Sequence, residues 1–164
     1  METDTKYILI THGIRPFAQR VARQLSGERR VVFGTADELP DVLLNSGKYI
    51  SLPNASSSAF VHEMLKVCLD HPIATVIPLG KLELARLLEA KILFDEYGIQ
   101  LLLPQRQVMD KLMIIENPPT QLPLIILEKG SVITGDSRQW DAALSGVFTP
   151  SDSGDEMALC CIAD

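Results

Sequence analysis

The sequence predicts an α/β fold in which helices flank an open parallel sheet, followed by a small C-terminal appendage rich in β-structure. Short apolar runs rich in β-branched residues alternate with helical patterns over residues 6–116, which is typical of βαβ units. Beyond this stretch, short apolar runs separated by turn residues replace the helical patterns. We therefore expect an α/β unit over 6–116 and the appendage over 117–164.

The first three expected elements form one βαβ unit. A strand is expected at 6–10, and Pro16 marks the start of a helix because the missing proline N–H has no partner in the first helical turn. Apolar residues recur at helical spacing after Pro16, and the serine and glycine at 26–27 should end the helix. A second strand at 30–33 completes the unit, which should cross over in the right-handed sense.

The same alternation continues through the first unit. The serines at 56–58 are expected to cap a helix that ends at His71, and a leucine-rich helix over 82–97 should end at Gly98. The other expected elements are a helical turn at 42–44 and strands at 49–52, 74–77 and 100–103. With the strand order 3-2-1-4-5, this unit has a Rossmann-like sheet.

In the appendage, a hairpin is expected over 124–134 and a final strand over 157–163. A helix that begins near Gln105 should be broken at Pro118. The remaining expectations are a short helix holding Trp140, Ala143 and Leu144, capped by Asp136 or Ser137, and a polar loop over 149–154. The final strand is apolar on both faces, and at a sheet edge it could pair with a second copy to form a homodimer.

Charge and hydropathy argue against two classes of partner. The net charge is −6 and the isoelectric point is about 5.0, so a nucleic acid is not expected as a partner. No apolar run approaches the ~20 residues that span a bilayer, so no membrane partner is expected. Residues 1–5 lack the basic start of a signal peptide, which favours a cytoplasmic location.

The three cysteines indicate neither a disulfide framework nor a metal site. Cys68 lies on an apolar helix face, whereas Cys160 and Cys161 are neighbours that should point to opposite faces of one strand. We expect all three thiols to be buried and reduced. The histidines at 12, 62 and 71 share no ligand-like spacing with each other or with the cysteines, so no metal ligands are expected.

The expected strand order places a candidate binding site where the chain reverses direction between the first and fourth strands. Ligands of open α/β sheets bind in this crevice, beyond the carboxyl ends of the strands. Two helix starts there offer free N–H groups and a favourable dipole, which predicts a small carboxylate or phosphate ligand. The candidate ligand-binding residues are Thr11, His12, Gly13, Arg15, Pro78, Lys81 and Glu83. The alternative is that Gly13 serves only a tight turn and that Lys81 and Glu83 are surface charges.

A dinucleotide site is disfavoured at the same turn. It needs three glycines, for the tight turn, for close approach to the pyrophosphate and for helix packing. Only Gly13 is present, and the residues at 15–17 are large where small ones are needed. Asp37 lies about where an acidic residue would bind the ribose, but turn-forming residues surround it. We therefore expect no cofactor.

Six short segments carry a family resemblance through their order and spacing. They are ILITHGIRP at 8–16, VVFGTAD at 31–37, YISLP at 49–53, VIP at 76–78, LP at 103–104 and VMDK at 108–111. Through these segments, roughly residues 6–116 resemble the pre-ATP-grasp domain that opens the ATP-grasp carboxylate–amine ligases and carbamoyl-phosphate-synthase-like enzymes. In the family, the Asp-Lys pair, here Asp110 and Lys111, opens a helix that leads into the ATP-grasp body.

The resemblance implies a shortened ATP-grasp remnant in the appendage. Residues 122–126 are similar to the strand that bears the family's nucleotide-contacting lysine, with Lys129 out of register, and 154–164 are similar to a later strand. The family commonly places acidic residues after the proline at 78, where this sequence has Lys81. The purine pocket, the second ATP-grasp subdomain and the magnesium-holding residues have no counterparts in this sequence.

Phosphoryl transfer needs the metal that those residues hold, so catalysis by this chain alone is not expected and no catalytic residues are assigned. Three hypotheses follow. The first is a stand-alone, non-catalytic module that binds a small anionic ligand or a partner protein. The second is the substrate-binding subunit of a split ligase, in which an ATP-grasp partner chain supplies ATP and Mg²⁺. The third is a structural protein that associates with itself.

Overall fold

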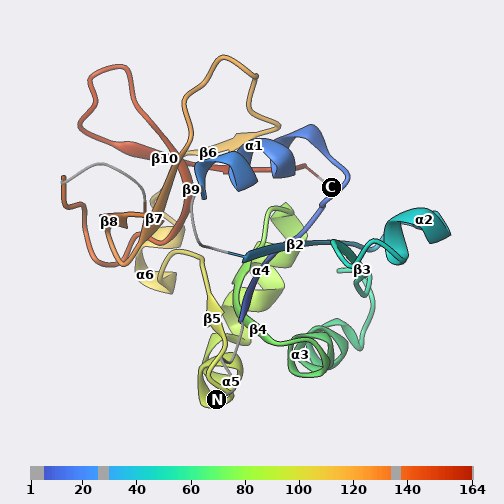
Figure 1. Ribbon diagram of the computed structural model, residues 1–164. Helices are drawn as coiled ribbons and strands as arrows, with labels where there is room; N and C mark the ends of the chain where they lie inside the picture. Colours follow the sequence, from blue (N-terminus) through green and yellow to red (C-terminus); the bar gives the residue numbers. More distant parts are fainter. Residues whose placement is uncertain (1–5, 26–29, 134–137, 164) are drawn as a thin grey trace, which may run out of the picture.

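The computed structural model describes residues 6–25, 30–133 and 138–163. The expected helix end at 26–27, the expected caps at Asp136 and Ser137 and the end of the hairpin at residue 134 lie outside the described residues. Within the described part, two five-stranded sheets account for the strands (Figure 1).

The first sheet is parallel throughout and has the order β3-β2-β1-β4-β5, so the expected strand order and the α/β, Rossmann-like fold are confirmed. Its strands are β1 Tyr7–Ile10, β2 Arg30–Thr35, β3 Tyr49–Ser51, β4 Ile73–Ile77 and β5 Gln100–Leu101. Strand β1 lies at the centre, between β2 and β4, and the chain reverses its direction of strand addition there. Strand β4 has buried side chains on both of its faces, as expected for a parallel sheet that is covered on both sides.

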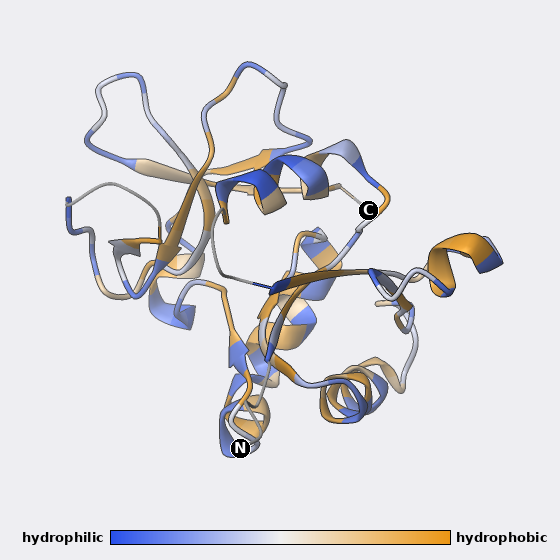
Figure 2. Ribbon diagram, viewed as in Figure 1, coloured by the Kyte–Doolittle hydropathy of each residue, from blue (hydrophilic) through white to orange (hydrophobic). Residues whose placement is uncertain are grey.

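Helices cover both faces of this sheet (Figure 1). The helices of the described residues are α1 Pro16–Gln24, α2 Asp41–Leu44, α3 Phe60–Asp70, α4 Lys81–Glu89, α5 Lys91–Glu96 and α6 Arg106–Met109, of which the short α2 and α6 have no buried residues. The buried faces of α3, α4 and α5 share a hydrophobic core with Leu9 and Val76. Helix α1 packs against the other face, where Ile8 and Ile10 point. Figure 2 shows the resulting hydrophobic strands and the hydrophobic helix α2, which projects from the end of β2 and β3.

Several expected helix boundaries were wrong. The helix predicted over 82–97 is two helices, because Ala90 leaves the helical conformation at φ −99° and ψ 6°. The serines at 56–58 do not cap α3, which begins after Ala59 without a side-chain cap. The Ser57 hydroxyl instead accepts a hydrogen bond from the Ala59 N–H at 3.2 Å, which closes a turn before the helix.

The second sheet is mixed and has the order β6-β10-β9-β7-β8. Its strands are β6 Ile114–Glu116, β7 Ile125–Glu128, β8 Ser131–Val132, β9 Gly146–Pro150 and β10 Met157–Cys161. The antiparallel hairpin of β7 and β8 and the buried final strand are confirmed. Strand β6 pairs parallel to β10, whereas the other neighbours in this sheet pair antiparallel.

Four predictions for the C-terminal part were wrong. The helix expected from Gln105 ends at Met109, and residues 114–116 form a strand because β10 offers them hydrogen-bond partners. Residues 138–145 contain no helix, and the expected polar loop from residue 149 begins inside β9. Strand β10 lies between β6 and β9 rather than at an edge, so the expected pairing of its edge with a second copy has no free strand to use.

Helix α1 joins the two sheets. Its buried residues share a core with Ile126 and Cys160 of the second sheet. The Arg20 guanidinium donates hydrogen bonds to the carbonyl oxygens of Pro118, Pro119 and Leu122, at 3.4, 3.3 and 2.7 Å. The segment before β7 is therefore held against α1 by both apolar packing and directed hydrogen bonds.

Among the described residues, no helix is both long and apolar enough to cross a bilayer.

The three thiols are buried and free, as predicted. Burial raises the pKa of the Cys68 thiol from its ordinary value of 9.0 to about 12. Burial also raises the pKa of Cys160 to about 12, with a further rise from Cys161 and an opposing effect of Arg20.

We predict that iodoacetamide at pH 8 labels none of the 3 cysteines in the folded protein, because the thiolate is the reactive form. In guanidinium chloride, mass spectrometry should count all three labels. The raised pKa values also predict a stability contribution that is complete below pH 9 and is lost as the pH rises toward 12, because the unfolded thiols ionise first. Rapid labelling of Cys68 under native conditions would contradict the buried position.

Candidate functional site

The loops that follow β1 and β4 meet at the carboxyl edge of the first sheet, as the strand order requires. Thr11 is fully buried and lies directly after β1, and its hydroxyl accepts a hydrogen bond from the Leu79 N–H at 2.8 Å. The same hydroxyl donates to Glu83 Oε1 at 2.6 Å. Glu83 Oε1 also accepts from the Gly80 N–H at 3.1 Å, which is a capping interaction at the start of α4. A carboxylate that is only 5% exposed is thus held in a defined position.

His12 completes this cluster. Its Nε2 lies 3.6 Å from Glu83 Oε1, and its backbone has a φ of 52°, in the left-handed region that few non-glycine residues adopt. Gly80 leaves room for the ring, because a Cβ at this position would overlap His12 Nε2. Gly13 allows the loop after β1 to lie close to β2, because a Cβ at Gly13 would overlap the Cβ of Phe33. Both glycines are therefore required by packing around the site.

A hollow of about 260 Å³ opens beside this cluster. The carboxyl ends of β1, β2 and β3 and the start of α4 surround it. Its lining residues are His12, Ala36, Asp37, Pro53, Asn54, Ala55, Ser56, Leu82 and Glu83. Among the described residues, two carboxylates and one imidazole line the hollow, and neither a lysine nor an arginine does. The lining therefore suits groups that donate hydrogen bonds, such as hydroxyl or ammonium groups, better than it suits an anion.

The other residues predicted for the site are not among those that line the hollow. Arg15 is exposed and is the N-terminal cap residue of α1, three residues after His12. Lys81 Nζ lies 2.6 Å from Glu116 Oε1 on β6. Pro78 and Gly13 are buried in the loops that support the cluster. The structure thus brings Thr11, His12 and Glu83 together and places Arg15 and Lys81 outside the lining.

The two helix starts differ in accessibility. The Lys81 N–H at the start of α4 donates to the carbonyl oxygen of Ile162 at 3.0 Å, and the Ile162 N–H donates to Leu79 at 2.7 Å. The residue after β10 therefore covers part of the α4 start. At the start of α1, residues 14–16 are all exposed. An anion that uses a helix start has freer access at α1, next to Arg15.

Sequence reasoning did not assign Asn54 and Ser56 to the site, and it considered Asp37 only for a dinucleotide. These residues follow β2 and β3, whose carboxyl ends lie at the same edge as that of β1. Because the strands of a parallel sheet end at the same edge, the residues that follow β2 and β3 could have been included among the candidates from the sequence. The Asn54 side chain also closes a local turn, because its Oδ1 accepts a hydrogen bond from the Ser56 N–H at 2.9 Å.

A metal centre finds no support in the described ranges, which contain no cluster of three or more histidine, cysteine, aspartate or glutamate side chains suited to an ion. The fold and site define an α/β protein with a Rossmann-like parallel sheet and a hollow at its switch point. In comparisons with known proteins, no family model matches the chain and no curated protein is significantly similar to it.

Proposed function

We propose that this protein is a binding module without catalysis of its own, in the manner of a stand-alone pre-ATP-grasp domain. Its ligand occupies the hollow at the switch point of the parallel sheet. The observation that carries the proposal is the buried Glu83 carboxylate, which Thr11 and Gly80 hold in place beside His12. Burial of a carboxylate is costly unless it has partners, and this one also lines an open hollow.

The chemistry of the lining narrows the ligand. Asp37 and Glu83 accept hydrogen bonds from hydroxyl or amino groups of the ligand, and Asn54 offers both a donor and an acceptor. A carboxylate or phosphate on the same ligand lies at the exposed start of α1, where Arg15 supplies the charge. The proposed ligand is therefore a small hydroxylated or amino-bearing anion rather than a bare anion.

Arg15→Ala is expected to abolish binding of such an anion while changing the free energy of unfolding by less than about 1 kcal/mol, because Arg15 is exposed. Isothermal titration calorimetry should be run with inorganic phosphate, small hydroxy acids, phosphosugars and nucleotides. Arg23→Ala is the matched control, since Arg23 is an exposed arginine in the last turn of the same helix. Absence of heat from every ligand would count against the function, and unfolding of the Arg15 variant would make Arg15 structural.

The Glu83→Gln variant is expected to keep its fold and to bind the same ligand with an affinity at least about tenfold lower. The glutamine oxygen can still accept from Thr11 and Gly80, whereas the charge that strengthens hydrogen bonds from the ligand is lost. Circular dichroism checks the fold, and calorimetry checks the affinity. Unchanged affinity would place the ligand away from the hollow.

A partner chain is a second proposal, and strand β6 favours it. Among the described strands, β6 ends the second sheet, and Met113 and Ile114 beside this edge are 70% and 37% exposed. An open edge with apolar side chains is suited to pairing with another chain. Light scattering distinguishes a homodimer from a monomer, and recovery of an ATP-grasp protein from the native cell would favour a split ligase. Turnover of ATP by the purified chain alone would contradict the non-catalytic proposal.

A further inference from the structure

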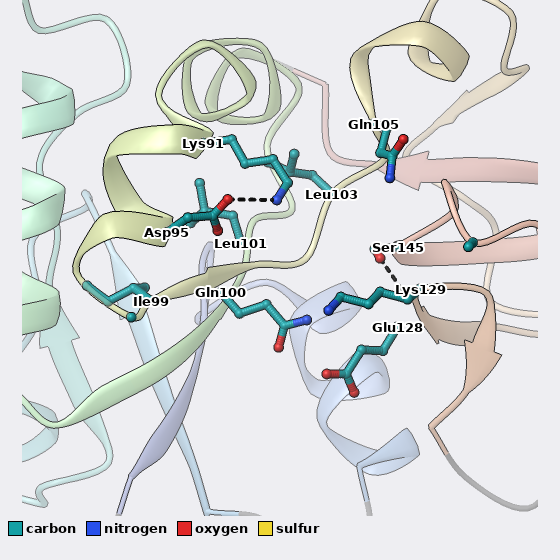
Figure 3. A pocket seen from close by; sticks show the side chains of 12 residues that line it. Lys91, Asp95, Ile99, Gln100, Leu101, Leu103, Gln105, Glu128, Lys129 and Ser145 are labelled. Atoms are coloured by element: carbon teal, nitrogen blue, oxygen red, sulfur yellow. Dashed lines mark hydrogen bonds and ion pairs between the residues drawn. The ribbon is translucent and has the colours of Figure 1, made fainter.

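A second and larger hollow, of about 440 Å³, lies between the two sheets and away from the switch point (Figure 3). One wall comes from α5 and β5 of the first sheet, and the other comes from the turn between β7 and β8. Buried Leu101 and Leu103 supply apolar surface. The charged and amide side chains in the lining include those of Lys91, Asp95, Gln100, Glu128 and Lys129.

The turn between β7 and β8 presents two charges to this hollow. Lys129 and Gly130 have φ values of 50° and 81°, as in the type I′ turns that join tight hairpins. Neighbours in a strand point to opposite faces, but the left-handed backbone at Lys129 allows both Glu128 and Lys129 to line the same space. A side chain at Gly130 would overlap the carbonyl oxygen of Trp140.

Hydrogen bonds hold the turn in place. The Lys129 N–H donates to the Ser145 hydroxyl at 2.8 Å, and the Gly130 N–H donates to the Leu144 carbonyl oxygen at 2.8 Å. The segment before β9 therefore fixes the backbone from which both charged side chains extend. A site with a fixed backbone loses less entropy when it binds a ligand.

The charges around this hollow are balanced in sign. Lys91 Nζ and Asp95 Oδ2 pair with each other at 3.3 Å. In the described part of the chain, no ion pair involves the side chains of Glu128 or Lys129. Figure 3 shows the Gln100 amide directed toward the Lys129 ammonium, with Glu128 beside them. An ammonium, a carboxylate and an amide thus converge on one space above an apolar surface.

We propose that this hollow binds a small zwitterion, in which a carboxylate and an ammonium group are separated by one to three carbons. The ligand carboxylate contacts Lys129 and Gln100, and the ligand ammonium contacts Glu128. Its carbon atoms lie against Leu101 and Leu103. The volume falls within the usual range of small-molecule pockets. The lining differs from that of the switch-point hollow, where the described lining residues include two carboxylates and neither lysine nor arginine, so the two hollows select different ligands.

The test uses the full chain and titration calorimetry with alanine, β-alanine and γ-aminobutyrate. We expect at least one of these zwitterions to bind, and N-acetylalanine and alaninamide, which each lack one charge, to bind at least tenfold more weakly. Lys129→Gln and Glu128→Gln should each lower the affinity for the zwitterion at least tenfold. Lys48→Gln is the matched control, because Lys48 is an exposed lysine in the segment before β3. Circular dichroism of each variant confirms that the fold is retained.

Three results would overturn this inference: no heat from any zwitterion, equal binding of the single-charge analogues, or unchanged affinity in both hollow variants. The Arg15→Ala and Glu83→Gln variants separate the two sites. If they abolish zwitterion binding while Lys129→Gln leaves it intact, the ligand occupies the switch-point hollow, and the inference fails without affecting the proposed function. Intact zwitterion binding in the switch-point variants is the result that supports a separate site.

Discussion

Val76→Asp is expected to prevent folding of the whole chain. Val76 is 0% exposed on β4, where it pairs with Leu9 of β1 and Leu101 of β5. Val76 lies in a cluster of buried hydrophobic residues, so the new carboxylate is buried among apolar side chains or takes up a proton. Either outcome costs several kcal/mol, which is a large part of the roughly 5–15 kcal/mol that keeps a domain folded. Far-UV circular dichroism and the yield of soluble protein measure the effect.

Val42→Asp is the matched control for this prediction. Val42 is 77% exposed on α2, so the same chemical change there should alter the free energy of unfolding by less than about 0.5 kcal/mol. Val76→Ala tests volume without charge and should leave a folded but less stable protein. A Val76→Asp variant with native circular dichroism and an unchanged melting temperature would show that β4 is not covered on both faces.

Phe148→Ala is expected to destabilise the protein by about 3–5 kcal/mol, the usual cost of removing a buried aromatic ring. Phe148 is 0% exposed on β9 of the second sheet. It belongs to the same hydrophobic core as Leu9 and Val32 of the first sheet. Loss of its ring should therefore weaken both sheets together, and unfolding should remain a single transition.

Two probes distinguish this outcome from independent unfolding of the sheets. Trp140 is the only tryptophan and lies near the second sheet, so its fluorescence reports on that part, whereas far-UV circular dichroism reports on all the helices. The two transitions should coincide in urea. Tyr97→Ala is the control, because Tyr97 is 54% exposed and should contribute little. Separate transitions would mean that the sheets do not share one cooperative core.

The two proposed sites place different demands on a ligand although they lie in one small protein. Glu83 and Asp37 make the switch-point hollow acidic, whereas Lys129 and Glu128 balance each other in the second hollow. Arg15, which the sequence placed in the crevice, lies at the exposed start of α1. Binding of a bare anion was predicted from helix starts alone, and the acidic side chains of the hollow are the reason for adding donor groups to the proposed ligand.

Much of the first sheet could be predicted because its signals are local. Apolar strands, the proline that begins α1 and the glycine after α5 act within a few residues, and their alternation with helices implies a parallel sheet. The division between α4 and α5 at Ala90 could not be predicted, because leucines continue at helical spacing across it.

The second sheet was harder to predict because its strands depend on distant partners. Strand β6 has three residues and gains its hydrogen bonds from β10, more than forty positions later in the chain. Strand β9 pairs on both sides, with β7 and with β10. Its last two residues are a threonine and a proline, which is why the sequence predicted a polar loop there. Propensity over such short segments is weaker than the hydrogen bonds that a sheet supplies.

Hydrophobic periodicity and the alternation of strands with helices predicted the α/β class, and the assumed strand order then placed a site at the carboxyl edge of the sheet. Which side chains share that edge depends on tertiary packing. Thr11 and Glu83 are 72 positions apart and meet because β1 and β4 are neighbours. Lys81 instead turns to Glu116, because β6 and β10 bring that carboxylate to the start of α4. Contacts between distant residues depend on how whole layers pack, and no local pattern encodes them.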